Sequence, residues 1–151
     1  MLTIHRNIVG IVVLSKDGKI LHGMQDPKTS VHPGCWIIPG GGMDDGETKE
    51  DAIIRELKEE TGLDIFGYKL EFLGDKRTAV FEKTLRSTGE RVLCDMTFFD
   101  FRVSIPLLAK DIPIYPSDDL LECKWIDIKE LKNFKLPSPS IELFKQFGYL
   151  P

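Results

Sequence analysis

Hydrophobic residues at the start of the chain predict two adjacent strands joined by a tight turn. Ile8 to Leu14 is an apolar run rich in β-branched residues, which is typical of a buried strand. In Lys16 to Lys19, an Asp-Gly pair can supply the positive φ that a hairpin turn requires. Lys19 to Met24 is the expected partner strand. The polar segment Gln25 to Gly34 contains two prolines and is expected to be a loop.

Residues Thr48 to Thr61 carry the one long helical pattern in the first half of the chain. Thr48 is expected to act as the N-cap, and Glu50 and Asp51 lie in the first turn, where the helix dipole favours anions. Gly62 supplies the expected stop at the carboxyl end.

In the second half of the chain, the pattern of hydrophobic and polar residues predicts further strands and a terminal helix. The helix is expected to start at Ser138 or Ser140 and to run through Phe147. Strands on both sides of a central helix imply an α/β sandwich with a mixed β-sheet, formed by a single domain over residues 1–151. The expected strands are Tyr68 to Phe72, Ala79 to Lys83, Arg91 to Val103 and Glu122 to Ile128.

Charge and composition narrow the possible partners. The formal net charge is −4, and nonspecific binding to nucleic acid or to anionic membranes needs a basic surface, so neither is expected. The amino terminus has no signal-peptide pattern, and its apolar run is too short to span a bilayer. The three cysteines are odd in number and match no metal-ligand spacing. A cytoplasmic location is therefore expected.

Three carboxylates crowd one side of the predicted central helix. At about 100° per residue, Glu56, Glu59 and Glu60 fall within a stripe roughly 100° wide, next to the apolar face. Like charges spaced in this way repel one another, which indicates a cation between them. Carboxylate oxygens without thiols or imidazoles suit a hard cation, so Mg²⁺ is the first choice and Mn²⁺ the second. The alternative is an ordinary solvated helix face.

The segment before this helix favours the metal interpretation. Trp36 to Pro39 is expected to be extended, and three glycines, Gly40 to Gly42, follow it. Glycines lack side-chain bulk, so the backbone there can come close to a ligand. Arg55 and Glu47 are expected to form an ion pair that holds this loop against the helix. The alternative is an ordinary surface pair.

The stretch from Gly41 to Leu63 resembles the Nudix box, in which a glycine, five residues, a glutamate and seven residues precede the pattern REUxEExGU, with U aliphatic. The segment from Trp36 to Gly41 is also similar to the residues that usually precede the box. The matching positions are Gly41, Glu47, Arg55, Glu56, Leu57, Glu59, Glu60, Gly62 and Leu63.

The resemblance implies a hydrolase that cleaves pyrophosphate bonds with the help of Mg²⁺. Metal ligands would be Glu56, Glu59 and Glu60, with the carbonyl of Gly40 as a further ligand. Either Glu56 or Glu59 would take the proton from the attacking water, with Arg55 and Glu47 as supporting members of the catalytic set. An acidic residue after the box serves as base or ligand in some members. Here Asp119 is the candidate, with Asp118 and Glu122 as alternatives.

Substrate contacts are expected along the glycine loop and after the box. Gly41 and Gly42 would lie against the phosphates. Family members often have an arginine where the second strand ends, but this chain has Met24-Gln25-Asp26, and Lys28 is the candidate replacement. Further candidates, each with an ordinary surface or core role as the alternative, are Lys76 and Arg77 for phosphates, and Phe81, Phe98 or Phe99 for stacking on a base.

The substrate is narrowed mainly by features that the chain lacks. The proline and the tyrosine that mark ADP-ribose and dinucleoside polyphosphate hydrolases are not found, and the chain is most similar in size to mutator-type nucleoside triphosphate pyrophosphohydrolases. Its segment Leu136 to Ser140 has no asparagine of the kind that reads oxidised guanine in some members. A small nucleotide is the expected partner of a monomer or homodimer. The alternatives are a nucleotide sensor without activity, or a hydrolase of ADP-ribose, dinucleoside polyphosphates or capped RNA.

Overall fold

The computed structural model describes residues 1–151 as a mixed β-sheet between two helical layers. The main sheet has the strand order β4-β5-β1-β2-β6, and the short strand β3 pairs with β1. Strands β1 and β5 are parallel, and the other pairs are antiparallel. The strands are β1 (Thr3–Leu14), β2 (Lys19–Gln25), β3 (Gly40–Gly42), β4 (Glu71–Thr84), β5 (Arg91–Ser104) and β6 (Leu120–Asp127).

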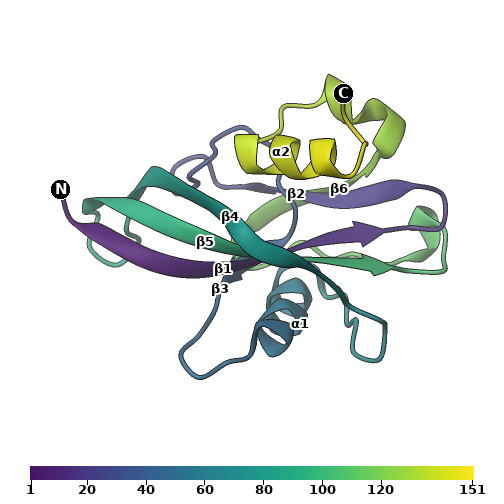
Figure 1. The fold of residues 1–151 in the computed structure, drawn as a ribbon, viewed down its shortest axis with the longest axis horizontal. Coiled ribbons are helices and arrows are strands. Elements are labelled where there is room, and N and C mark those ends of the chain that lie inside the picture. Colours follow the sequence, from purple (N-terminus) through teal and green to yellow (C-terminus); the bar gives the residue numbers. More distant parts are fainter.

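Helices cover the two faces of this sheet. Helix α1 (Lys49–Thr61) lies on one side, and α2 (Ser138–Gln146) lies on the other, as Figure 1 shows. Two short 3₁₀ helices, Ala109–Asp111 and Ile128–Asn133, flank β6 in the chain. None of the helices is long and apolar enough to cross a membrane. The predicted α/β sandwich with a mixed sheet is therefore confirmed.

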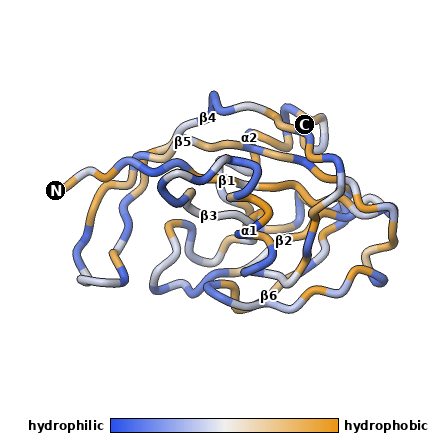
Figure 2. The backbone as a smooth tube through the Cα atoms, turned by 90° about the horizontal axis from the view of Figure 1, so that it is seen from below, coloured by the Kyte–Doolittle hydropathy of each residue, from blue (hydrophilic) through white to orange (hydrophobic).

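Strand β1 contributes to the hydrophobic cores on both faces. Val9, Ile11 and Val13 pack in the core under α1, whereas Val12 packs in the core under α2. Successive side chains of a strand point to opposite faces, so a strand covered on both sides must be apolar at nearly every position. This explains the continuous apolar run in the sequence. In Figure 2, hydrophobic segments lie mainly along the central strands and hydrophilic ones mainly in the outer loops.

The segment before α1 enters the sheet instead of forming an open loop. Strands β1 and β2 pair at Leu14 and Ile20. Farther from this turn, the segment before α1 lies between the two strands. Ile37 bridges to Gly23 of β2, and the amide N–H of Ile11 in β1 donates to the carbonyl of Pro39 (3.0 Å). The glycine loop predicted from the sequence is thus a strand that is fixed to β1.

Strand β4 also differs from the prediction. Its residues were expected to form two strands, Tyr68 to Phe72 and Ala79 to Lys83, but one strand runs from Glu71 to Thr84. Its register with β5 shifts twice, between Phe72 and Gly74 and between Gly74 and Arg77. Extra residues in a strand make a bulge, and Gly74 adopts a φ of 125° there. The polar break in the sequence marks this bulge and not a loop.

Both ends of α1 are capped as predicted. The Thr48 hydroxyl accepts a hydrogen bond from the amide N–H of Asp51 (3.1 Å). At the other end Gly62 has a φ of 75°, and its N–H donates to the carbonyl of Lys58 (2.9 Å). A left-handed residue at this position is readily supplied by glycine. These local interactions set the residues at which the helix begins and ends.

Candidate active site

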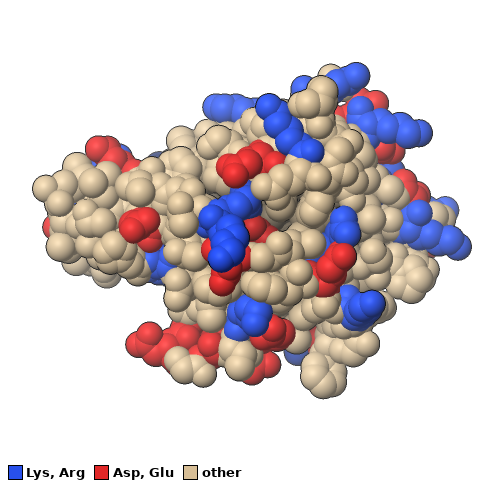
Figure 3. Space-filling model, in the orientation of Figure 1, with Lys and Arg blue, Asp and Glu red and all other residues tan.

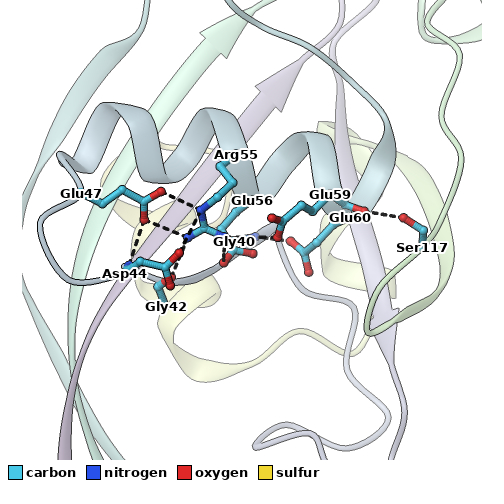
Figure 4. Close-up of polar contacts among 9 residues, drawn as sticks. All are labelled: Gly40, Gly42, Asp44, Glu47, Arg55, Glu56, Glu59, Glu60 and Ser117. Atoms are coloured by element: carbon cyan, nitrogen blue, oxygen red, sulfur yellow. Dashed lines mark hydrogen bonds and ion pairs between the residues drawn. The ribbon is translucent and has the colours of Figure 1, made fainter.

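Three carboxylates meet close to the β3 glycines. Oxygen atoms of Glu56, Glu59 and Asp118 lie within 4.8 Å of one another. Glu56 is largely buried, whereas Glu59 and Asp118 are exposed. In Figure 4 the acidic side chains of α1 project from one side of the helix toward the β3 glycines. Burial raises the pKa of Glu56, and the hydrogen bond and charge of Arg55, which lower it, offset this only in part.

The third carboxylate comes from a loop that is tied to the end of α1. The amide N–H of Ser117 donates to the carbonyl of Glu60 (2.9 Å), and its hydroxyl donates to the carbonyl of Glu59. The amide N–H of Tyr115 donates to the carbonyl of Thr61 (2.8 Å). The last carbonyls of a helix have no partners inside it, so this loop satisfies them. Asp118 follows directly, with a φ of 57° that turns it toward the cluster.

Asp118, one of the two alternatives to Asp119, lies in the three-carboxylate group, and a metal-binding role for Asp119 stays a prediction. The Asp119 carboxylate accepts a hydrogen bond from the Gln25 amide (3.0 Å) and pairs with Arg86 (3.3 Å). Glu122, the other alternative, lies in β6 opposite Met24 and is outside the three-carboxylate group.

Glu60 has a separate environment. Its side chain is 1% exposed, and one oxygen accepts a hydrogen bond from the amide N–H of Gly40 (2.8 Å). Burial, followed by a hydrogen bond with the neighbouring Asp119 carboxyl, raises the pKa of this carboxyl to about 10. Its carboxyl is not among the three that cluster, and the role of Glu60 as a metal ligand stays a prediction.

The β3 glycines are required for close approach. A Cβ on Gly40 would lie 2.0 Å from the carbonyl oxygen of Val9, which is backbone and cannot move aside. A Cβ on Gly41 would lie 2.5 Å from the Glu56 carboxylate. Gly40 lies opposite Gly10, and this pair is not hydrogen-bonded, whereas the pairs on either side of it are. In an antiparallel ladder, a residue of such a pair has its N–H and C=O pointing away from the partner strand, so both groups of Gly40 point away from β1. Its carbonyl consequently faces the same side as its N–H, toward α1.

Arg55 joins the helix, the preceding loop and the carboxylate cluster. Its guanidinium donates to both oxygens of Glu47 (2.6 and 2.9 Å) and to the carbonyl of Gly42 (3.1 Å). A third nitrogen donates to Glu56 (3.0 Å) and Glu59 (3.2 Å). Hydrogen bonding to Arg55 lowers the pKa of Glu47 to about 2. The ion pair expected from the sequence is thus present, and it fixes the loop as predicted.

A cavity of about 350 Å³ opens next to the cluster, on the α2 side of the sheet. Glu56, Asp118 and the three β3 glycines form one wall, and residues of β1 and β5 form its floor. Gly41 and Gly42, two of the predicted substrate contacts, line it. So does Phe98, whereas Phe99 packs against the core under α1.

The other predicted substrate contacts are placed differently. Lys28 and Lys76 are exposed and lie outside the cavity wall, and Phe81 packs edge-to-face against His32 (4.5 Å between ring centres). Arg77 lines the cavity but is bound at two points by Asp100 (2.8 and 2.9 Å) and donates to the carbonyl of Pro139. Both partners are nearly buried, so Arg77 is an internal link and not a free cation.

The sequence did not identify three arginine or lysine residues of the cavity wall: Arg6, Lys83 and Arg86. They are scattered over the chain and belong to no motif. The register of β1, β4 and β5 places Arg6 and Lys83 on one face of the sheet, and Arg86 lies in the turn after β4.

Comparison with known proteins agrees with this geometry. A family model described as the NUDIX domain matches residues 4–147. The chain is 28% identical over 148 residues to a protein named nucleoside triphosphatase NudI from Enterobacter sp., covering 96% of this chain and 98% of that protein. It is 30% identical over 158 residues to an RNA pyrophosphohydrolase from Bartonella quintana, with 96% and 86% covered.

Other matches are shorter or structural. An ADP-ribose pyrophosphatase from Methanocaldococcus jannaschii is 47% identical over 51 residues, which are 34% of this chain and 29% of that protein. The chain thus spans only about a third of some curated relatives that it matches. The E. coli dihydroneopterin triphosphate pyrophosphohydrolase has a similar fold, with a TM-score of 0.67 at 21% identity, covering 95% of this chain and 97% of the other.

Proposed function

This chain belongs to the Nudix family of pyrophosphohydrolases, and we propose that it is a Mg²⁺-dependent enzyme that hydrolyses a nucleoside triphosphate at a pyrophosphate bond. The observation that carries this proposal is the group of three carboxylates, Glu56, Glu59 and Asp118, at the wall of a cavity large enough for part of a nucleotide.

The donor atoms fit a hard divalent cation. The group offers only carboxylate oxygens, and no thiol or imidazole belongs to it, which favours Mg²⁺ or Mn²⁺ over softer metals. Glu56, Glu59 and Asp118 would hold the metal, with Glu60 and the carbonyl of Gly40 as further ligands. A bound metal supplies positive charge that neutralises phosphate oxygens and activates the attacking water.

Glu56 is our choice for the group that takes the proton from water. It lines the cavity, and burial raises the pKa of its carboxyl, which makes it a better proton acceptor than an ordinary glutamate. Glu59 is the alternative. Arg55 positions both, because one of its nitrogens donates to each carboxylate. Glu47 in turn holds Arg55 through two hydrogen bonds.

The cavity also supports a nucleoside at the other end of the substrate. Phe98 presents an aromatic ring from β5, with the Arg77 guanidinium over one side of it (5.3 Å to the ring centre), and Ser140 offers a hydroxyl from the start of α2. An aromatic face beside a hydroxyl is suited to a planar base with polar edges. The relative that this chain matches over nearly its whole length is named a nucleoside triphosphatase, which supports the same substrate class.

Two other functions make different predictions. An RNA pyrophosphohydrolase is favoured by the relative from Bartonella quintana. Against it, acidic side chains gather along the lower edge of the molecule in Figure 3, around α1 and the loop before it, and a long RNA would be repelled there. A sensor without activity would bind a nucleotide but not cleave it, although this chain retains every box carboxylate.

A nucleotide panel distinguishes these functions. We would incubate the protein with nucleoside triphosphates, ADP-ribose, dinucleoside polyphosphates and 5′-triphosphorylated RNA, with and without Mg²⁺, and measure phosphate after adding pyrophosphatase. We expect Mg²⁺-dependent release from one or more nucleoside triphosphates. Release from RNA alone would favour the RNA enzyme, and tight binding with no turnover of any compound would favour the sensor. The cytoplasmic location and the monomeric or dimeric state stay predictions from the sequence.

A further inference from the structure

Two basic side chains on the cavity wall have no acidic partner. Arg6 of β1 and Lys83 of β4 both line the cavity, and neither takes part in an ion pair within the chain. Their basic neighbour Arg86 differs, because it pairs with Asp119 (3.3 Å). The cavity also contains carboxylates, but Arg6 and Lys83 form no ion pair with them, so these two cations are candidates to bind an anion.

The strand register brings these two residues to the same face of the sheet. Arg6 of β1 pairs with Met96 of β5, and Met96 also pairs with Ala79 of β4, so these three residues form one row across the sheet. Lys83 is four residues beyond Ala79 on a stretch without a bulge and therefore points to the same side. Figure 1 shows the first half of β1 beside β5 and β4, extending past α1.

The electrostatic environment indicates that an anion would be favourable here. Lys83 is half-buried, and burial is the main cause that lowers the pKa of its amine, followed by the positive charge of Arg6. The positive charge of Arg86 also lowers the pKa of Lys83, and the negative charge of Asp119 raises it but does not cancel these effects. Gathering like charges costs free energy, and a bound anion would remove that cost.

The chemistry of phosphate esters identifies the anion. A terminal phosphate monoester carries a charge of about −1.5 to −2 at pH 7. ADP-ribose and dinucleoside polyphosphates have no such end, because each of their outer phosphates is esterified to a sugar. The protein as a whole is negative, so a triphosphate needs local cations beyond those that a metal at the carboxylates provides.

We propose that Arg6 and Lys83 bind the free terminal phosphate of the substrate while its inner phosphates lie at the carboxylate group, so that the enzyme selects compounds with a triphosphate end. This proposal rests on the function proposed above. It assigns to Arg6 and Lys83 the phosphate contact that the sequence had suggested for Lys28, Lys76 and Arg77.

The test is a binding measurement that does not depend on turnover. We would titrate inorganic tripolyphosphate and, separately, ADP-ribose into the protein by calorimetry at a fixed concentration of free Mg²⁺. Arg6→Gln and Lys83→Met should each weaken tripolyphosphate binding at least about tenfold and leave ADP-ribose binding within about twofold. Lys83→Arg should retain most of the affinity, because it keeps the charge. The matched control is Lys145→Met, an exposed lysine of α2 outside the cavity.

The outcomes separate this proposal from the proposed function. If both variants melt like the wild type and bind tripolyphosphate within twofold of it, the terminal-phosphate site is wrong, even if the wild type hydrolyses triphosphates. An equal loss of ADP-ribose binding would also overturn it, because that would show a general effect on the cavity. If the wild type cleaves nothing on the panel but both variants lose tripolyphosphate binding, the site stands and the proposed hydrolysis fails.

Discussion

Acid should destabilise this protein through one buried histidine. His22 lies in β2 with a side chain that is 0% exposed. Its Nδ1 lies 3.1 Å from the carbonyl oxygen of Ile20, and its Nε2 has no hydrogen-bond partner. Burial lowers the pKa of the imidazole from 6.5 to about 4, because a charged ring would lose its hydration.

The size of the effect follows from that shift. In the unfolded chain the imidazole takes up a proton near pH 6.5, whereas in the folded chain it does so only near pH 4. The unfolded state therefore binds more protons between these values, and stability falls as the pH falls through this window. At 1.36 kcal/mol for each pKa unit, the loss reaches about 3 kcal/mol at pH 4 and is absent above pH 7.

Urea unfolding at a series of pH values from 7.5 to 4 would measure this loss. His22→Leu removes the titrating group and keeps an apolar side chain beside Phe144, whose ring centre lies 5.8 Å from that of His22. The difference in stability between wild type and variant should change by about 3 kcal/mol over this range. The control is His5→Gln, because His5 is 79% exposed and its contact with Asp95 (2.8 Å) is open to solvent, where such pairs contribute little to stability. A difference that stays constant with pH in His22→Leu would refute the reasoning.

Three substitutions test other parts of the structure. Glu59→Gln should lower turnover at least about a hundredfold with an unchanged circular dichroism spectrum, since it removes one carboxylate of the metal group; near-normal initial rates would contradict the assignment. Gly40→Ala should reduce stability by about 1–3 kcal/mol in chemical unfolding, because its Cβ would collide with the Val9 carbonyl, and an unchanged midpoint would show that β3 can shift. Thr48→Ala should cost about 1 kcal/mol by loss of the N-cap and leave turnover unchanged; a large fall in turnover would mean that the cap also positions the carboxylates.

The features of α1 could be predicted because they depend on residues close in the chain. Its capping residues and its ion pair between Arg55 and Glu47 lie within a single short segment. The spacing of Glu56 and Glu59 also fixes their common side of the helix. Local interactions of this kind require no knowledge of how distant strands pair.

The sequence analysis did not predict features that depend on pairing between distant strands. The glycines of β3 become a strand only because β1 and β2 separate and leave β1 free to pair with them. Arg77 looks like a free cation in the sequence, but its partner Asp100 is 23 residues away on β5. Hydrophobic patterns cannot show which strands are neighbours, so neither arrangement could be foreseen.

The choice between two adjacent aspartates was also beyond the sequence. Asp118 and Asp119 have the same chemistry and differ only in backbone conformation. The positive φ of Asp118 turns it toward Glu59, and the bonds of Ser117 to the end of α1 hold it there. Asp119 accepts a hydrogen bond from Gln25 and lies beside Glu60. The backbone conformation of Asp118 depends on contacts with α1, which is far away in the sequence, so the residues around Asp118 do not reveal it.

The central claim is that Glu56, Glu59 and Asp118 together bind a divalent cation. Crystals grown with Mn²⁺ would test it most directly, because the anomalous scattering of manganese locates the ion independently of any assumed ligand. We expect an anomalous peak bounded by oxygens of these three carboxylates, and its loss in Glu59→Gln crystals grown in the same way. Millimolar Mn²⁺ that gives no peak at this position, or a peak unaffected by the substitution, would contradict the account.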